Sequence, residues 1–227
     1  MYADLMQVIR RRLDTIRLIQ DMAGDDFSRA ESAAFQGRKT IEGIAFACLV
    51  ATENGIKHVP RDAIGQWNAE KILRGLKKKG IETLPNPSIM RYPTDQERAD
   101  NPGVGTTIEG QPALCLSHDQ LIEIYQNTHR WLHEINPYTE PDRTDFYTKN
   151  GASFWQEMGK VDRFIDKHFI SIGGEASSAC CGIRWTDRQR CKPCLARLDG
   201  GRDDKNAASA ICSATPECYA PSCACCC

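Results

Sequence analysis

The sequence has no excess of charge of either sign, because 29 lysines and arginines nearly balance 30 aspartates and glutamates. Overall charge therefore gives no argument for a nucleic acid or an anionic membrane as a partner, and any basic patch has to be local. Long apolar runs are also lacking, since the longest, residues 44–51, is far too short to span a bilayer. No basic-then-apolar leader opens the sequence. We therefore expect a cytoplasmic protein that does not enter a membrane.

Cysteine is scarce over most of the chain. Only Cys48 and Cys115 lie before residue 180, and the other ten of the twelve cysteines lie from Cys180 onward. This change in composition indicates a boundary near Gly174. We expect a helical domain over residues 1–174, which is long enough for a sizeable core, and a cysteine-rich tail over residues 175–227.

Apolar residues recur at three- and four-residue spacing through most of the first domain, which predicts helices. The expected fold class is all-α or mainly α, a helical bundle. The five expected helices are Tyr2–Met22, Asp26–Asn54 (or from Ser28), Arg61–Lys79, Ser117–Asn136 and Ala152–Phe169. The second of these ends apolar on all sides, so it is expected at the centre of the bundle.

Residues 81–116 are rich in proline and glycine and predict an irregular insertion between two helices. Short strands are expected within it at Ile89–Tyr92, Thr106–Glu109 and Ala113–Leu116. Insertions of this length are often functional lids or disordered. A polar loop is expected over residues 138–150, before the last helix.

The clearest helix, Ser117–Asn136, is bounded by strong signals. Ser117 is expected to cap its first turn, and Gln120 completes a capping box. Pro137 is expected to end the helix, because the residue before a proline is disfavoured in the α region.

The same helix carries a concentration of catalytically useful side chains. Gln126, His129, Arg130 and His133 recur at helical spacing beside its apolar face, and Asn136 follows one turn later. Such a stripe could bind a phosphate and transfer protons. The simpler interpretation is a solvated face that happens to carry two histidines.

Arg38 and Glu42 precede the most apolar part of the second helix. In the simpler interpretation they form an ordinary ion pair between residues one turn apart. A charged pair beside an apolar segment, however, needs polar partners. The alternative is therefore a half-buried pair that faces the stripe of His129 and His133.

The tail, residues 175–227, is poor in aliphatic side chains and is not expected to fold unaided, so disorder is expected. Cys191 and Cys194 have the two-residue spacing of a zinc knuckle, and other tail cysteines could complete a four-ligand zinc site. Two alternatives remain for the tail. It could be the translation of GC-rich DNA in an unintended reading frame, or its cysteines could form disulfides. No cofactor is expected for the helical domain.

Five helices, with Arg38 and Glu42 on an early apolar one and His129, Arg130 and His133 on a later one, resemble the HEPN superfamily of small helical bundles. The resemblance implies a metal-independent RNase, usually a dimer, from a prokaryotic toxin–antitoxin, phage-defence or CRISPR system. In such a site a histidine and an arginine activate the ribose 2′-OH and stabilise the charged phosphorane, and an acidic residue supports them.

The spacing of the family's motif differs from the one found here. The motif places a histidine four to six positions after the arginine, whereas two residues separate Arg130 from His133. The formal spacing occurs at Arg163 and His168, where the residue after the arginine is Phe164 and not polar.

Three functions follow from these residues. In an RNase or nucleotide-handling domain, His133 is the acid or base, Arg130 stabilises the phosphate, Glu42 orients them, and His129 could replace either. In a non-catalytic helical interaction protein, Arg38, Glu42 and the histidines form a buried polar network. In a metal protein, His129, His133 and Glu42 are ligands, although Arg130 stands where the HExxH signature has glutamate.

Overall fold

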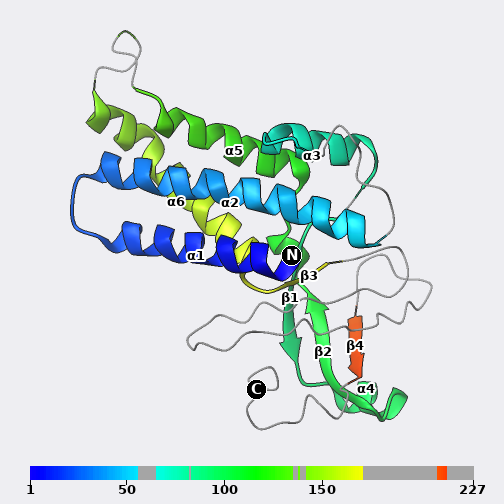
Figure 1. The fold of residues 1–227 in the computed structure, drawn as a ribbon. Helices are drawn as coiled ribbons and strands as arrows, with labels where there is room; N and C mark the ends of the chain where they lie inside the picture. Colours follow the sequence, from blue (N-terminus) through cyan, green and yellow to red (C-terminus); the bar gives the residue numbers. More distant parts are fainter. Residues whose placement is uncertain (56–64, 82, 135–137, 139–141, 171–208, 214–227) are drawn as a thin grey trace. The chain divides into compact units, whose positions relative to one another are not determined.

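The computed structural model describes residues 1–55, 65–81, 83–134, 138, 142–170 and 209–213 (Figure 1). The chain divides into two compact units. The first comprises Met1–Leu84 and Leu116–Arg163, and the second comprises Pro85–Cys115 and Phe164–Cys227. The described residues are predominantly helical, so the mainly α fold class is confirmed.

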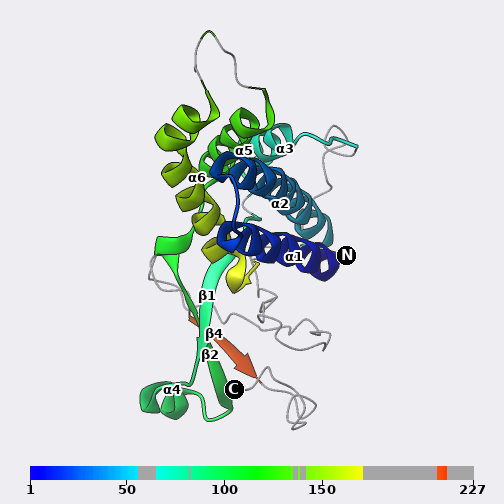
Figure 2. The same cartoon turned by 90° about the vertical axis from the view of Figure 1, so that its left-hand side faces the viewer.

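The first unit is a helical bundle. Its helices are α1 (Tyr2–Asp21), α2 (Asp26–Gly55), α3 (Ala69–Lys78), α5 (His118–Leu132) and α6 (Arg143–Asp166), the last of which runs on beyond the unit's boundary. Figure 1 shows α1 and α2 side by side as an antiparallel pair. The helix α5 packs on α2, and α3 packs on both of them. Figure 2 shows α6 beside α5.

The core of the bundle is centred on α2, as its apolar character predicts. Side chains of this helix with no exposed surface include Ile41, Ile44, Ala45, Ala47 and Cys48. Burial raises the pKa of the Cys48 thiol to about 12, so this cysteine is a packing residue and not a nucleophile.

The helices α1 and α2 pack closely at Gly43. A Cβ atom added there would lie 2.9 Å from Cγ1 of Ile9, a side chain that is itself buried. Because isoleucine is branched at Cβ, it has few rotamers by which to move away. Glycine at this position therefore allows the two helices to pack.

An aromatic cluster joins the end of α5 to the start of α6. The ring centroid of Trp131 lies 4.8 Å from that of Phe146 and 5.0 Å from that of Phe154. The prediction of a polar loop over residues 138–150 was therefore wrong from residue 143 onward. The α6 helix begins at Arg143, where the Asp142 carboxylate accepts a hydrogen bond from the backbone N–H of Asp145 at 2.8 Å.

The start of α3 was also predicted too early. The helix begins at Ala69, and the side chain of Asn68 caps it by accepting from the backbone N–H of Lys71. Trp67, which lies inside the expected helix, precedes the observed one and is 80% exposed. The first residues of the expected helix, 61–64, lie outside the described residues.

The capping box predicted for α5 is confirmed, with reciprocal hydrogen bonds between Ser117 and Gln120. The helix ends at Leu132, earlier than expected, because His133 adopts an extended conformation as its C-cap. Asn136 and Pro137 lie outside the described residues. The last helix ends at Asp166, also earlier than expected, and His168–Phe169 form a short strand.

The second unit contains an antiparallel sheet with the strand order β3-β1-β2-β4. Its strands are β1 (Asn86–Arg91), β2 (Val104–Gly110), β3 (His168–Phe169) and β4 (Ser209–Ser213). The strands predicted at 89–92 and 106–109 are confirmed in β1 and β2. The strand predicted at 113–116 was wrong: Pro112–Leu114 forms a 3-10 helix, since proline cannot donate to a sheet and suits the start of a helix. A short helix that the sequence did not predict, α4 (Asp95–Asp100), lies between β1 and β2.

Apart from β4, the cysteine-rich tail lies outside the described residues, and so do Cys191 and Cys194. Within the part of the chain that the structure describes, no helix is both long and apolar enough to cross a membrane.

The close approach at Gly43 predicts an effect of alanine substitution opposite to the usual one. Gly43→Ala is expected to lower the free energy of unfolding by about 1–3 kcal/mol, because the added methyl group overpacks Ile9. The matched control is Gly75→Ala on α3, where an added Cβ meets nothing within 4 Å. That substitution should raise the free energy of unfolding by roughly 0.5–1 kcal/mol, because alanine loses less backbone entropy. Urea denaturation measures both; a stabilised Gly43→Ala variant would contradict this packing.

Candidate active site

The candidate site is built around the carboxylate of Glu42 on α2, whose side chain is 12% exposed. Lys39 donates to one of its oxygens at 2.7 Å, and Arg38 donates to the other at 3.3 Å. A carboxylate so little exposed needs such partners, because an unpaired buried charge is strongly destabilising. Two cations surround one anion, so the group keeps a net positive charge.

Tyr125 connects this group to α5. Its hydroxyl donates to Glu42 at 3.4 Å, and the guanidinium carbon of Arg38 lies 5.1 Å from the centroid of its ring. Burial raises the pKa of Tyr125, so the hydroxyl stays protonated and remains a donor. Sequence analysis did not single out Tyr125. The signal that could have identified it is its position one turn before His129.

His129 packs edge-on against Tyr125, with ring centroids 5.0 Å apart. Its Nε2 atom is buried and has no hydrogen-bond partner within the part of the chain that the structure describes. Burial lowers the pKa of His129, and the positive charges of Arg38 and His133 lower it further, against smaller opposing effects of Glu70 and Glu42. The imidazole is therefore neutral near pH 7 and can accept a proton.

His133 lies beside His129 at the end of α5, with ring centroids 6.3 Å apart, and is exposed. Arg130 points in another direction. Its guanidinium carbon lies 5.6 Å from the centroid of the Phe146 ring on α6, which is a cation–π contact with the aromatic cluster. The structure thus brings Arg38, Glu42 and His129 together, with His133 beside them, and leaves Arg130 on a different flank.

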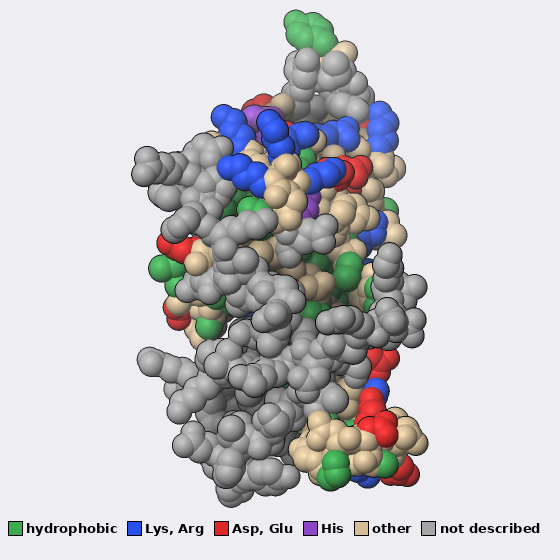
Figure 3. Space-filling view, turned by 90° about the vertical axis from the view of Figure 1, so that its right-hand side faces the viewer, with side chains coloured by type: hydrophobic (Ala, Val, Ile, Leu, Met, Phe, Trp, Pro, Cys, Tyr) green, Lys and Arg blue, Asp and Glu red, His purple; other side chains and the backbone are tan. Residues whose placement is uncertain are grey.

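A second acidic residue reaches the site from α3, and sequence analysis missed it. Hydrogen bonds from Gln126 and then from Arg74 lower the pKa of Glu70, so its carboxylate is charged beside His129. Arg74 Nη2 lies 2.9 Å from the Glu70 carboxylate. On the face of the molecule drawn in Figure 3, lysine and arginine side chains gather with histidine among them.

Arg163 and His168, which have the spacing of the HEPN motif, do not form a comparable site. His168 is buried, and its Nδ1 lies 3.1 Å from the carbonyl oxygen of Ile165. Among the described residues, no three or more histidine, cysteine, aspartate or glutamate side chains group as metal ligands, and this includes His129, His133 and Glu42.

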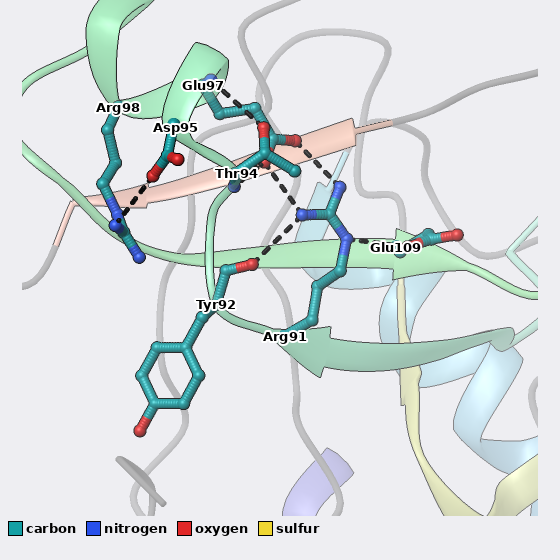
Figure 4. Close-up of polar contacts among 7 residues, drawn as sticks. All are labelled: Arg91, Tyr92, Thr94, Asp95, Glu97, Arg98 and Glu109. Atoms are coloured by element: carbon teal, nitrogen blue, oxygen red, sulfur yellow. Dashed lines mark hydrogen bonds and ion pairs between the residues drawn. The ribbon is translucent and has the colours of Figure 1, made fainter.

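Another polar cluster, in the second unit, has a structural role (Figure 4). Arg91 donates to both carboxylate oxygens of Glu97 at 2.8 Å and to Glu109 at 2.8 Å. The hydrogen bonds from Arg91, and next from the backbone of Thr94, lower the pKa of Glu97 to about 2. These groups satisfy one another and hold α4 against β1 and β2, so they are not candidates for chemistry.

Comparisons of the chain with protein-family models, with curated proteins and with solved structures each found no match. The function has to be argued from the geometry above.

The environment of His129 predicts its titration. Measured by NMR, its imidazole should titrate below the ordinary value of 6.5, and Arg38→Gln should raise the pKa by removing a nearby positive charge. Lys160→Gln, which removes an exposed cation from α6, is the control and should leave it unchanged. A pKa at or above 6.5 in the unmodified protein would show that His129 is not held neutral.

Proposed function

We propose that the helical unit is a metal-independent ribonuclease or nucleotide-handling domain whose chemistry takes place at His129. The observation that supports this most strongly is the imidazole of His129, neutral because burial lowers its pKa, beside the positive charge of Arg38, which lies over the ring of Tyr125 that His129 also contacts. A neutral base next to a cationic group is the combination that transfer of a phosphoryl group to an adjacent hydroxyl requires.

In the proposed reaction, His129 takes the proton of a ribose 2′-OH as the 2′-oxygen forms a bond to phosphorus. The bond from phosphorus to the 5′-oxygen breaks, and that oxygen receives a proton from His133 or from water. The products are a 2′,3′-cyclic phosphate and a 5′-hydroxyl end, with no change of oxidation state. Arg38 and Lys39 stabilise the negative charge that develops on the phosphorane oxygens.

Glu42 and Tyr125 are positioning residues in this proposal. The carboxylate holds Arg38 and Lys39, and the tyrosine supports the ring of His129. The proposal therefore differs from the roles suggested by sequence alone, since His129 replaces His133 as the base and Arg38 replaces Arg130 as the phosphate ligand.

The resemblance to the HEPN superfamily supports the same reaction. It also favours a homodimer acting on RNA in the cytoplasm of a prokaryote, within a toxin–antitoxin or phage-defence system. These features belong to the proposal and are tested separately from the chemistry, the dimer by the mass of the protein in solution.

RNA cleavage by the purified full chain in the presence of EDTA tests the proposal. His129→Ala should reduce the rate by about 10²–10⁴-fold, because it removes the general base. Arg38→Gln should reduce it by roughly 10²–10³-fold, because it removes charge stabilisation of the transition state. Lys160→Gln is the matched control for the loss of a cation. Arg130→Gln tests whether Arg130, and not Arg38, stabilises the phosphate.

Circular dichroism should show that the variants remain folded. Cleavage that requires a divalent metal, or that survives His129→Ala at the unmodified rate, would contradict the proposal.

A non-catalytic helical interaction protein is the second candidate, and one observation favours it. Glu42 and Arg38 already satisfy each other, and Tyr125 completes the group, as in a buried network whose role is structural. Absence of RNA cleavage by the unmodified full chain, together with a stable fold of His129→Ala, would support this candidate over the ribonuclease.

A further inference from the structure

Trp67 is the most conspicuous residue near the site that the proposed chemistry does not use. Its side chain is 80% exposed, which is unusual for so large an apolar group. At such exposure at least one face of the indole ring is open to solvent. The ring meets Phe46 of α2 nearly at right angles, with centroids 6.3 Å apart.

The backbone around Trp67 is held in place despite the exposure of the side chain. The backbone N–H of Asn68 donates to the side chain of Gln66 at 3.1 Å, and the side chain of Asn68 accepts from the backbone N–H of Lys71 at 3.1 Å. A fixed backbone and the contact with Phe46 reduce the conformational entropy that the tryptophan side chain would lose when a ligand stacks against it.

Two sequence relationships place this tryptophan beside the candidate site. Phe46 follows Glu42 by one turn of α2, a rise of about 6 Å along the helix axis. Glu70, which acts on the pKa of His129, follows Trp67 by three residues. The indole therefore contacts a residue of α2 one turn from Glu42, and it precedes Glu70 of α3 by three residues.

From this arrangement we infer that Trp67, supported by Phe46, stacks against an unpaired nucleobase next to the phosphate that is cleaved, so that the substrate is single-stranded RNA. This inference rests on the proposed function and specifies its substrate. Stacking on an aromatic side chain needs a base face that is not already covered, which a single strand offers and a duplex does not.

The charges around the indole favour a nucleic acid over an apolar protein surface as its ligand. Arg38, Lys39 and Arg74 lie close to the same site, and cations next to an exposed aromatic ring are the combination found in grooves that bind single strands. A protein partner would instead have to neutralise these cations while covering the ring.

The test measures binding of the full chain to a short single-stranded RNA in which every 2′-OH is methylated, so that cleavage cannot occur. Fluorescence anisotropy should show affinity reduced about tenfold or more by Trp67→Ala, because one stacked base is lost. Trp67→Phe should retain most of the affinity, whereas Trp67→Leu should resemble Trp67→Ala, because leucine is apolar but cannot stack. Tyr92→Ala removes another exposed aromatic ring, 72% exposed, and is the matched control.

Two further probes identify the base as the stacked group. The unmodified protein should bind an oligonucleotide with abasic sites more weakly than the strand that carries bases. Its affinity for the abasic oligonucleotide should equal that of Trp67→Ala. A duplex of the same sequence should also bind more weakly than the single strand.

The inference is overturned if the unmodified protein does not bind the methylated strand, if Trp67→Ala binds it equally well, or if abasic sites have no effect. These results are independent of the chemistry. Binding that depends on Trp67 without any cleavage of ordinary RNA would uphold the stacking of a base on Trp67 and reject the ribonuclease. Cleavage that depends on His129, together with normal binding of the RNA by Trp67→Ala, would support the ribonuclease and reject stacking on Trp67.

Discussion

The structure of the candidate site depends on the need to satisfy one half-buried carboxylate. Glu42 lies in the central helix of the bundle, and Arg38, Lys39 and Tyr125 donate hydrogen bonds to its carboxylate. These contacts fix the guanidinium of Arg38 over the Tyr125 ring and connect α2 to α5. His129 then packs against the same tyrosine, and its pKa is lowered by burial and next by the charge of Arg38, the residue that Glu42 holds in place.

Sequence periodicity predicted the backbone framework of this site well. The apolar end of α2 required a central helix, and the need of a charged pair beside it for polar partners gave one of two alternatives, that Arg38 and Glu42 face α5. The contact of Glu42 with Tyr125 favours this alternative, because it places Glu42 against α5. Periodicity could not separate His129 from His133 or Arg38 from Arg130, because those distinctions depend on where each side chain ends and what surrounds it.

Where the sequence prediction was wrong, contacts between distant residues outweighed local preference. Residues 143–150 are polar and contain poor helix formers, yet they belong to α6, because the packing of Phe146 on Trp131 stabilises the helical conformation. At α3 the error was the reverse, since Trp67 lies inside the expected helix but outside the one that Asn68 caps. The exposure of Trp67, which suggests a binding role, could not be inferred from its type, because tryptophan is usually well buried.

The most direct measurement of the central claim is the chemistry of the RNA ends left by the full chain in EDTA, determined by mass spectrometry. A neutral His129 that activates a 2′-OH predicts 2′,3′-cyclic phosphate and 5′-hydroxyl ends. Ends that carry a 5′-phosphate would show that water, and not the 2′-oxygen, attacks the phosphorus. That result, or the absence of any product, would contradict the assignment of His129 as the base of a metal-independent ribonuclease.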